Sequence, residues 1–131
     1  NRRLTNHEIK NEMGNIYYYA NELNMAEAFY REALNIKPDY TPSMSNLARN
    51  LFESNKNLDE GMDLINKALE IYPENPYYLK TKGKGLYKLK EYEEALRFYE
   101  KSWNARNFYN HDLYMDIQEV KGVLVNQEAE H

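Results

Sequence analysis

The stretch M-A-E-A-F-Y-R-E-A-L-N-I-K-P, residues 25–38, decides the fold, because near copies of it recur further along the chain. Within it a small residue, Ala26, is followed by the large Tyr30, and the stretch ends at Pro38. The same small, large and proline positions return with one common offset at Gly61, Ile65 and Pro73, and the first two return again at Ala95 and Tyr99. Offsets kept at several positions together indicate an internal repeat.

The length of the repeat follows from the residues that precede this stretch. Gly14 of the first copy is matched by Ala48 in the second and by Gly83 in the third, which indicates a period of about 34 residues. The step from Ala48 to Gly83 is one position longer than the step from Gly14 to Ala48. The second copy therefore carries a single insertion, which we place near the polar turn at residues 53–57. Three such copies fill most of the chain.

Each copy has the pattern of two amphipathic helices joined by a short polar turn. In the first copy, apolar residues recur at helical spacing on both sides of the polar break at residues 21–24. Pro38 and Pro73 each end a second helix, because proline cannot continue one. Pro42 and Pro76 stand at the start of the next helix, where the missing N–H costs little.

The small residues of the repeat predict places where two helices approach closely. A bulky side chain there would push the helices apart and cost about 1–3 kcal/mol through overpacking. We expect large residues, such as Tyr30, Ile65 and Tyr99, to fill the space that the small residues of a neighbouring helix leave. The small positions are Gly14, Ala26, Ala48, Gly61, Gly83 and Ala95.

With these positions in place, the chain resembles the tetratricopeptide repeat family, whose unit is a helix–turn–helix of about 34 residues with small, aromatic and proline residues at set places. The matching positions are Met13, Gly14, Tyr17, Ala26, Tyr30, Ala33 and Pro38 in the first unit, Leu47, Ala48, Leu51, Gly61, Ile65, Ala68 and Pro73 in the second, and Gly83, Leu86, Ala95, Tyr99 and Ser102 in the third. The resemblance implies an all-α fold, a right-handed α-solenoid of stacked helix pairs.

The chain divides on this basis into three repeats between short ends. We expect an N-terminal flank at residues 1–6, repeats at 7–40, 41–75 and 76–109, a capping helix at 110–125 and a frayed tail at 126–131, which makes seven helices. Apolar residues at helical spacing indicate the capping helix, which would cover the last apolar face of the stack. These residues are Leu113, Ile117, Val120 and Leu124, and we expect Trp103, Phe108 and Tyr109 beneath them.

The composition argues against several classes of chemistry. The chain has no cysteine, and its histidines, His7, His111 and His131, show no metal-ligand spacing, so we expect no metal and no other cofactor. Glu93 and Glu94 are interpreted as a solvated helix face and not as a catalytic pair. The net charge of −4 is unlike the basic surface of nucleic-acid binders. No apolar run is long enough to insert in a membrane, and no signal peptide opens the chain. The missing initiator methionine indicates a longer parent protein or a removed leader or tag.

The resemblance also implies where a partner would bind, since the first helix of each family repeat lines a concave groove. Lys80, Lys84 and Lys88 are spaced by four positions and share one helix face. Together with neighbouring aromatic residues, these lysines suit the binding of an extended peptide with acidic groups or a free carboxylate. The alternative is that the lysines only form a solvated helix face. The expected groove residues are Asn11, Asn15, Tyr18, Tyr19, Asn46, Arg49, Phe52, Tyr77, Lys80, Lys84, Tyr87 and Lys88.

One subfamily clamps the C-terminal carboxylate of heat-shock chaperone tails with two asparagines and three basic residues. The matching asparagines are present here as Asn15 and Asn46. The three basic residues are absent, because Asn11, Tyr77 and Thr81 stand at their positions. The known clamp is therefore not expected in this chain.

The leading hypothesis is a non-enzymatic module that binds a peptide or protein segment in the groove. One alternative is a structural spacer that can self-associate. Another is an accessory domain of a larger protein, enzymatic or not. The sequence leaves the identity of the partner and the cellular compartment open.

Overall fold

The computed structural model describes residues 3–106 and 109–130 of the chain. Within these ranges the chain forms seven α-helices and no strand, which confirms the predicted all-α class. The helices are α1 (Asn6–Tyr19), α2 (Leu23–Ile36), α3 (Thr41–Glu53), α4 (Leu58–Ile71), α5 (Pro76–Lys88), α6 (Tyr92–Ala105) and α7 (His111–Ala129).

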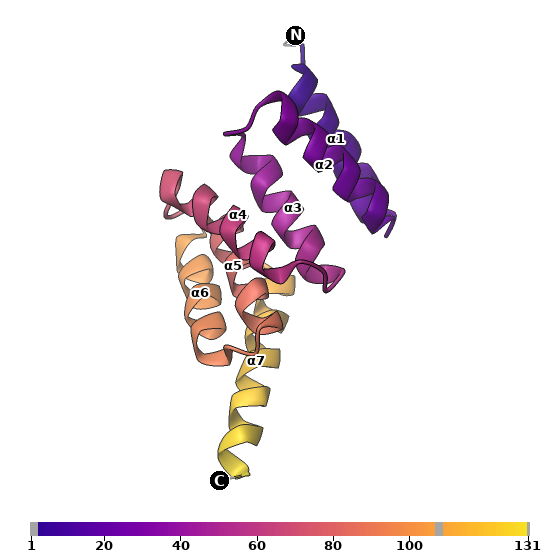
Figure 1. Cartoon of the computed structure of the whole chain (residues 1–131). Helices are drawn as coiled ribbons and strands as arrows, with labels where there is room; N and C mark the ends of the chain where they lie inside the picture. Colours follow the sequence, from indigo (N-terminus) through magenta and orange to yellow (C-terminus); the bar gives the residue numbers. More distant parts are fainter. Residues whose placement is uncertain (1–2, 107–108, 131) are drawn as a thin grey trace.

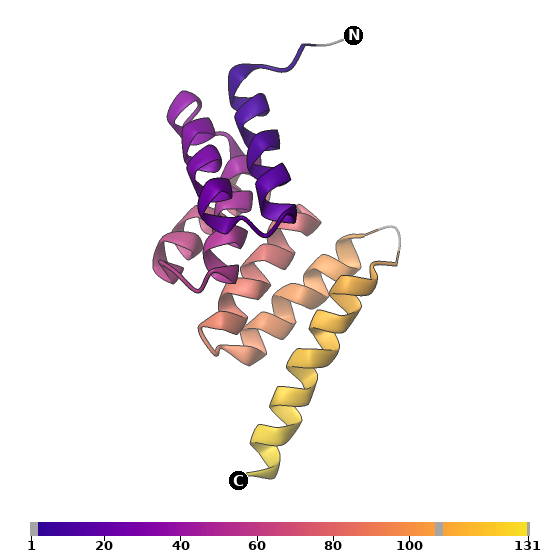
Figure 2. The ribbon, with the colours of Figure 1, turned by 90° about the vertical axis from the view of Figure 1, so that its right-hand side faces the viewer.

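Consecutive helices form antiparallel pairs, and the pairs stack in chain order (Figure 1). α1 packs with α2, α3 with α4 and α5 with α6, while α2 contacts α3 and α4 contacts α5 between the pairs. α7 lies along α6, and its C-terminal part extends past the α5–α6 pair (Figure 2). The architecture is the expected solenoid of three helix pairs and a capping helix.

The turns within the three pairs share a backbone conformation, with one difference. Asn21, Asn55 and Lys90 occupy equivalent places and have left-handed φ angles of 61°, 54° and 65°. The second turn is one position longer, and the N-cap of α4, Asn57, is also left-handed, with a φ of 50°. Asparagine adopts this conformation more readily than most residues. The insertion in the second repeat is therefore accommodated by a second left-handed asparagine.

Small residues of the repeat lie where an aromatic ring presses against a neighbouring helix. A Cβ atom added to Gly14 would lie 2.4 Å from the ring of Tyr30, and one added to Gly83 would lie 2.5 Å from the ring of Tyr99. Tyr30 is fully buried, so its ring has no room to move aside in a close-packed interior. The predicted role of the small residues is confirmed at these two places.

A third ring, that of Phe52, connects the second and third helix pairs. A Cβ atom added to Gly61 of α4 or to Gly85 of α5 would lie 2.5 Å or 2.4 Å from this ring. Phe52 is fully buried, so its side chain offers a ligand no surface. Phe52 was expected in the groove; its ring fills the space between two helices that both carry glycine there.

α7 covers the last apolar face of the stack through Leu113, Ile117 and Val120, which are all buried. The helix continues to Ala129, beyond the predicted end at residue 125. Residues 126–129 contain no proline or glycine, and the backbone hydrogen bonds of the helix persist to its end. The part of the expected frayed tail before Glu130 is therefore helical.

The aromatic residues expected beneath α7 have different environments. Trp103 is half-buried and packs against the cluster that contains Leu113 and Ile117. Tyr109 is 61% exposed, so it does not lie under the helix as predicted. Phe108 lies outside the described residues.

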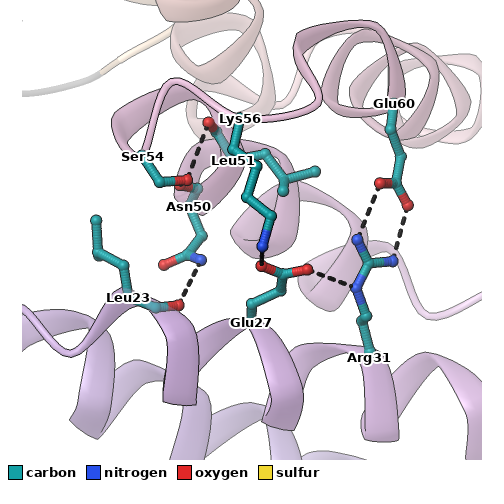
Figure 3. Close-up of polar contacts among 8 residues, drawn as sticks. All are labelled: Leu23, Glu27, Arg31, Asn50, Leu51, Ser54, Lys56 and Glu60. Carbon is teal, nitrogen blue, oxygen red and sulfur yellow. Dashed lines mark hydrogen bonds and ion pairs between the residues drawn. The ribbon is translucent and has the colours of Figure 1, made fainter.

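A polar network joins the first two helix pairs (Figure 3). The Glu27 carboxylate accepts hydrogen bonds from Lys56 Nζ at 2.8 Å and from Arg31 Nε at 2.9 Å. Arg31 also donates to both carboxylate oxygens of Glu60, at 2.8 Å and 2.9 Å. Bidentate charge-assisted contacts of this kind are directional. The network therefore ties α2 to the α3–α4 turn and to α4 in one register.

A buried amide beside this network makes a second polar link between the pairs. Asn50 Nδ2 donates to the backbone carbonyl of Leu23 at 2.9 Å, which connects α3 to the start of α2 (Figure 3). Ser54 Oγ donates to the carbonyls of Asn50 and Leu51, at 2.8 Å and 3.2 Å. The two carbonyls also accept backbone hydrogen bonds from the N–H groups of Ser54 and Lys56, so the hydroxyl adds a further bond at the end of α3.

Replacing Gly14 by alanine is expected to lower the free energy of unfolding by about 1–2 kcal/mol, because overlap with the Tyr30 ring outweighs the helix-propensity gain. Gly122 is the matched control, since a Cβ atom added there meets nothing within 4 Å. Gly122→Ala should instead raise the free energy of unfolding by up to about 1 kcal/mol. Urea denaturation measures both variants, and changes of the same sign would show that the ring contact does not limit the packing.

The network of Figure 3 makes the stability of the chain depend on pH. Burial acts to raise the pKa of Glu27, but the hydrogen bonds from Lys56 and Arg31 outweigh it and lower that pKa. The hydrogen bond from Arg31 lowers the pKa of Glu60 against the effect of burial. A carboxyl group with a lowered folded-state pKa stabilises the fold above its ordinary pKa, and this contribution is lost as the pH falls through the folded value.

Glu27→Gln is therefore expected to be less stable than the wild-type chain by about 1 kcal/mol near pH 7 and by much less near pH 2.5. Urea denaturation at the two pH values measures the convergence. The control is Glu100→Gln, at an exposed position of α6, which should show no convergence. A Glu27→Gln deficit of equal size at both pH values would contradict the assignment.

Candidate functional site

A hollow of about 610 Å³, here named the groove, is lined by α1, α3, α5 and α7. Every second helix of a stack of pairs faces the same side, which is why these four helices meet there. The volume is within the range of about 300–1,000 Å³ that is typical of ligand pockets. Of the predicted site residues, the structure brings Tyr18, Tyr19, Asn46, Arg49, Tyr77, Lys80 and Lys84 together, with Pro42, Ser45, Glu53, Asn75, Tyr78, Thr81, Asp112, Met115 and Asp116 completing the lining.

The other predicted site residues lie outside the groove. Tyr87 and Lys88 line a smaller, adjacent hollow of about 180 Å³. Asn11, like Phe52, is buried, with only 4% of its surface exposed. Asn15 is half-buried, and its amide oxygen is occupied by a hydrogen bond within the protein.

The three asparagines of the predicted site serve largely as links between helices. Asn11 Oδ1 accepts from Ser43 Oγ at 2.7 Å and from Asn46 Nδ2 at 3.0 Å, which connects α1 to α3. Asn15 Oδ1 accepts from the Tyr30 hydroxyl at 2.6 Å, which connects α1 to α2. Buried polar groups need such partners. An asparagine in the first helix of a repeat therefore does not by itself indicate a ligand contact.

The lysines of the predicted site face carboxylates of α7. Lys84 Nζ lies 3.7 Å from Asp116 Oδ2. Burial and then Lys84 lower the pKa of Lys80, while Asp116 and Asp112 act in the opposite direction. Burial raises the pKa of Asp116, and Lys84 and Lys80 partly offset this. Carboxylates of α7 therefore offset part of the positive charge that Lys80 and Lys84 give to α5.

α7 contributes to the groove and its rim, which was not expected from the sequence. Asp112, Asp116 and Glu119 follow one face of the helix at spacings of four and three positions, which is the signal that could have revealed it. The Tyr87 hydroxyl donates to Glu119 at 2.6 Å, and this bond, more than burial, raises the pKa of Tyr87 to about 12. The acidic face of α7 thus contacts both the lysines and the tyrosine of α5.

Arg49 occupies the opposite part of the groove, on α3. Its guanidinium carbon lies 3.7 Å from the centroid of the Tyr18 ring and 5.7 Å from that of Tyr19. The Tyr18 hydroxyl donates to Glu53, and burial together with this bond raises the pKa of Tyr18 well above its ordinary value. The groove therefore combines a cation stacked on tyrosines near α1 with carboxylates near α7.

Other kinds of site are not found in the described parts of the chain. No group of three or more histidine, aspartate or glutamate side chains there is arranged to hold a metal ion. None of the helices in residues 3–106 and 109–130 combines the length and apolar character needed to cross a bilayer.

Comparison with known proteins gives the context of this arrangement. Residues 7–40 match the tetratricopeptide repeat family. The tetratricopeptide repeat domain of Sgt2 from Aspergillus fumigatus has a TM-score of 0.84 at 19% identity, over 96% of this chain and 83% of that one. The first such domain of Spaghetti (RPAP3), bound to the HSP90 peptide SRMEEVD, has a TM-score of 0.78 at 18% identity, over 92% of this chain and 94% of that one. These likenesses show a shared fold.

A relative is also found among curated sequences. The uncharacterized protein ycf37 of Pyropia yezoensis is 35% identical over 63 residues. The matched segment covers 48% of this chain and 35% of that protein, so the chain corresponds to little more than a third of the relative's length.

Lys84→Met is expected to lower the free energy of unfolding by about 1 kcal/mol near pH 7, because it leaves the half-buried Asp116 carboxylate with only Lys80 to offset its charge. A carboxyl group whose pKa is higher in the folded than in the unfolded chain destabilises the fold when it is ionised. This destabilisation is lost as the pH falls through the folded-state pKa. The deficit should therefore shrink near pH 4, and adding Asp116→Asn should remove most of it near pH 7. Urea denaturation measures the free energy of unfolding of the wild-type chain, the two single variants and the double variant. A deficit that Asp116→Asn fails to relieve would show that Lys84 and Asp116 do not interact.

Proposed function

We propose that the chain, whose residues 7–40 match the tetratricopeptide repeat family, is a non-enzymatic interaction module that binds a segment of a partner protein, as an extended peptide, in the groove. The observation that carries the proposal is the groove itself, which gathers aromatic, amide and charged side chains from four helices. Such a mixture suits a chain that presents both apolar side chains and backbone polar groups.

Exposed tyrosines supply the apolar part of this surface. Tyr19 on α1 is 76% exposed and Tyr77 on α5 is 60% exposed, and both line the groove. A tyrosine offers a large contact area at low conformational-entropy cost, and its hydroxyl adds a hydrogen bond. Both properties favour a peptide whose side chains pack between the first and third repeats.

Asn46 supplies a polar contact between these tyrosines. Its Nδ2 is engaged with Asn11, whereas its Oδ1 accepts no hydrogen bond from the described residues. An amide oxygen in this state can accept from the backbone N–H of an extended peptide. We propose this role for Asn46 within the groove.

The likeness to Spaghetti supports a peptide as the kind of ligand, since that domain is bound to an HSP90 peptide in the same fold. The positions that correspond to the basic residues of the carboxylate-clamping subfamily are neutral here, as Asn11, Tyr77 and Thr81. A peptide held in this groove would therefore be recognised by other residues than those of the known clamp.

Selection from a random heptapeptide library with free C-termini is expected to recover peptides that bind in the groove. Tyr77→Ala should weaken the binding of a recovered peptide by about tenfold, since truncation of a central aromatic contact commonly costs more than about 1 kcal/mol. The control is Tyr72→Ala, at a position that is 53% exposed but outside the groove, and it should leave the affinity unchanged. Calorimetry measures both affinities. Failure to recover peptides, or equal losses in the two variants, would contradict the proposal.

A further inference from the structure

We infer that Arg49, and not the lysine stripe of α5, binds a carboxylate of the peptide in the groove. The inference rests on the proposed function and deepens it, because it names the chemistry of the ligand and the side chain that recognises it. The carboxylate can belong to an aspartate or glutamate or to the end of a chain, since both present the same two oxygens.

The first argument is that Arg49 is held in one orientation. Its guanidinium stacks on the Tyr18 ring at 3.7 Å, and the Tyr19 ring stands nearly perpendicular to that ring, with centroids 5.1 Å apart. Nη2 lies 3.5 Å from the hydroxyl oxygen of Tyr30, which is a long hydrogen bond. Stacking on an aromatic face leaves the N–H groups directed outward in the plane of the guanidinium. A ligand carboxylate can reach them without displacing the rings.

The second argument is that the described residues provide Arg49 with no carboxylate partner within 4.0 Å. Glu53, one turn further along α3, accepts its hydrogen bond from the Tyr18 hydroxyl instead. The Nε atom of Arg49 is enclosed without an acceptor, and Nη1 makes no hydrogen bond with a described residue. Because Nε is enclosed, a bound anion would be received by the Nη atoms, of which Nη1 has no partner among the described residues.

The third argument concerns the lysines, which the fold has already placed near negative charge. Lys84 pairs with Asp116 at 3.7 Å, and the carboxylates of Asp112 and Asp116 act on Lys80. A ligand carboxylate that approached α5 would meet both acids at short range, and like charges repel. Beside Arg49 the same ligand meets one acid, Glu53, whose carboxylate already accepts a hydrogen bond from the Tyr18 hydroxyl. The smaller number of nearby acids therefore favours approach of the carboxylate to α3.

Arginine is also the side chain best suited to this contact. Its planar fork matches the two oxygens of a carboxylate, which gives two parallel hydrogen bonds, whereas a lysine ammonium acts as a point charge. Replacing Arg49 by glutamine should therefore weaken the binding of an acidic peptide by about tenfold or more. Arg49→Lys, which keeps the charge but not the fork, should have an affinity between those of the wild-type chain and Arg49→Gln.

The test is a parallel selection of the random heptapeptide library against the wild-type chain, Arg49→Gln, and the double variant Lys80→Gln/Lys84→Gln. Wild-type selection should enrich aspartate or glutamate at one position, or require a free C-terminus. Free-acid and amidated forms of the recovered peptides distinguish these two sources of carboxylate. The Arg49→Gln selection should lose the acidic preference, and the double variant should keep it with a smaller loss of affinity. Lys67→Gln, at an exposed position of α4 outside the groove, should change neither.

Circular dichroism melting of each variant shows whether its fold is kept, and Arg49→Lys provides a second measurement if Arg49→Gln unfolds. Wild-type peptides that have no acidic side chain and bind equally well as C-terminal amides would overturn the inference while leaving the groove as a peptide site. So would an acidic preference that survives in Arg49→Gln and disappears in the lysine variant. A wild-type selection that recovers no peptide would overturn both the inference and the proposed function.

Discussion

The structure depends on one kind of contact, an aromatic ring that presses against a glycine of a neighbouring helix. Tyr30 meets Gly14 and Tyr99 meets Gly83, each within a helix pair. The ring occupies the volume that a side chain would otherwise fill, so two helices lie close together without a cavity. Because the contact recurs with the repeat, the first and third pairs have similar packing.

Contacts between pairs are of two kinds. Phe52 provides the apolar contact, since its ring lies against glycines of both α4 and α5 and so joins the second pair to the third. Glu27, Arg31 and Glu60 provide the polar contact between the first two pairs (Figure 3). Apolar packing tolerates small sliding movements, whereas bidentate hydrogen bonds are directional. Together the two contacts fill the interior and define the register in which α1, α3 and α5 line one side.

α7 has two consequences for the groove. Its buried face, formed by Leu113, Ile117 and Val120, closes the last apolar surface of the stack. Its acidic face carries Asp116 to within 3.7 Å of Lys84 and so changes the charge of the wall that α5 presents. The electrostatic character of the groove is therefore set as much by the helix that ends the solenoid as by the repeats themselves.

The sequence by itself determined the repeat, the helix pairs and the number of helices, because these depend on local signals. Helical periodicity, prolines at helix ends and glycines at close contacts all act within the span of a single repeat. Where a local signal was missing, the prediction failed, as at the end of α7, which has no proline or glycine to stop it. Periodicity also did not reveal which face is covered: Ile16 continues an apolar stripe yet is 68% exposed.

Only the tertiary structure decided which candidate site residues face the groove and which charges there are already paired. Phe52 and Lys84 occupy positions that line the groove in family members, but the first is enclosed between two glycine-bearing helices and the second is paired with α7. Arg49 lies among residues of α1 and α2 and has no carboxylate partner among the described residues. Each of these outcomes depends on side chains that come from different helices. Burial and the pairing of charges arise from such contacts between elements, and no local pattern of residues encodes them.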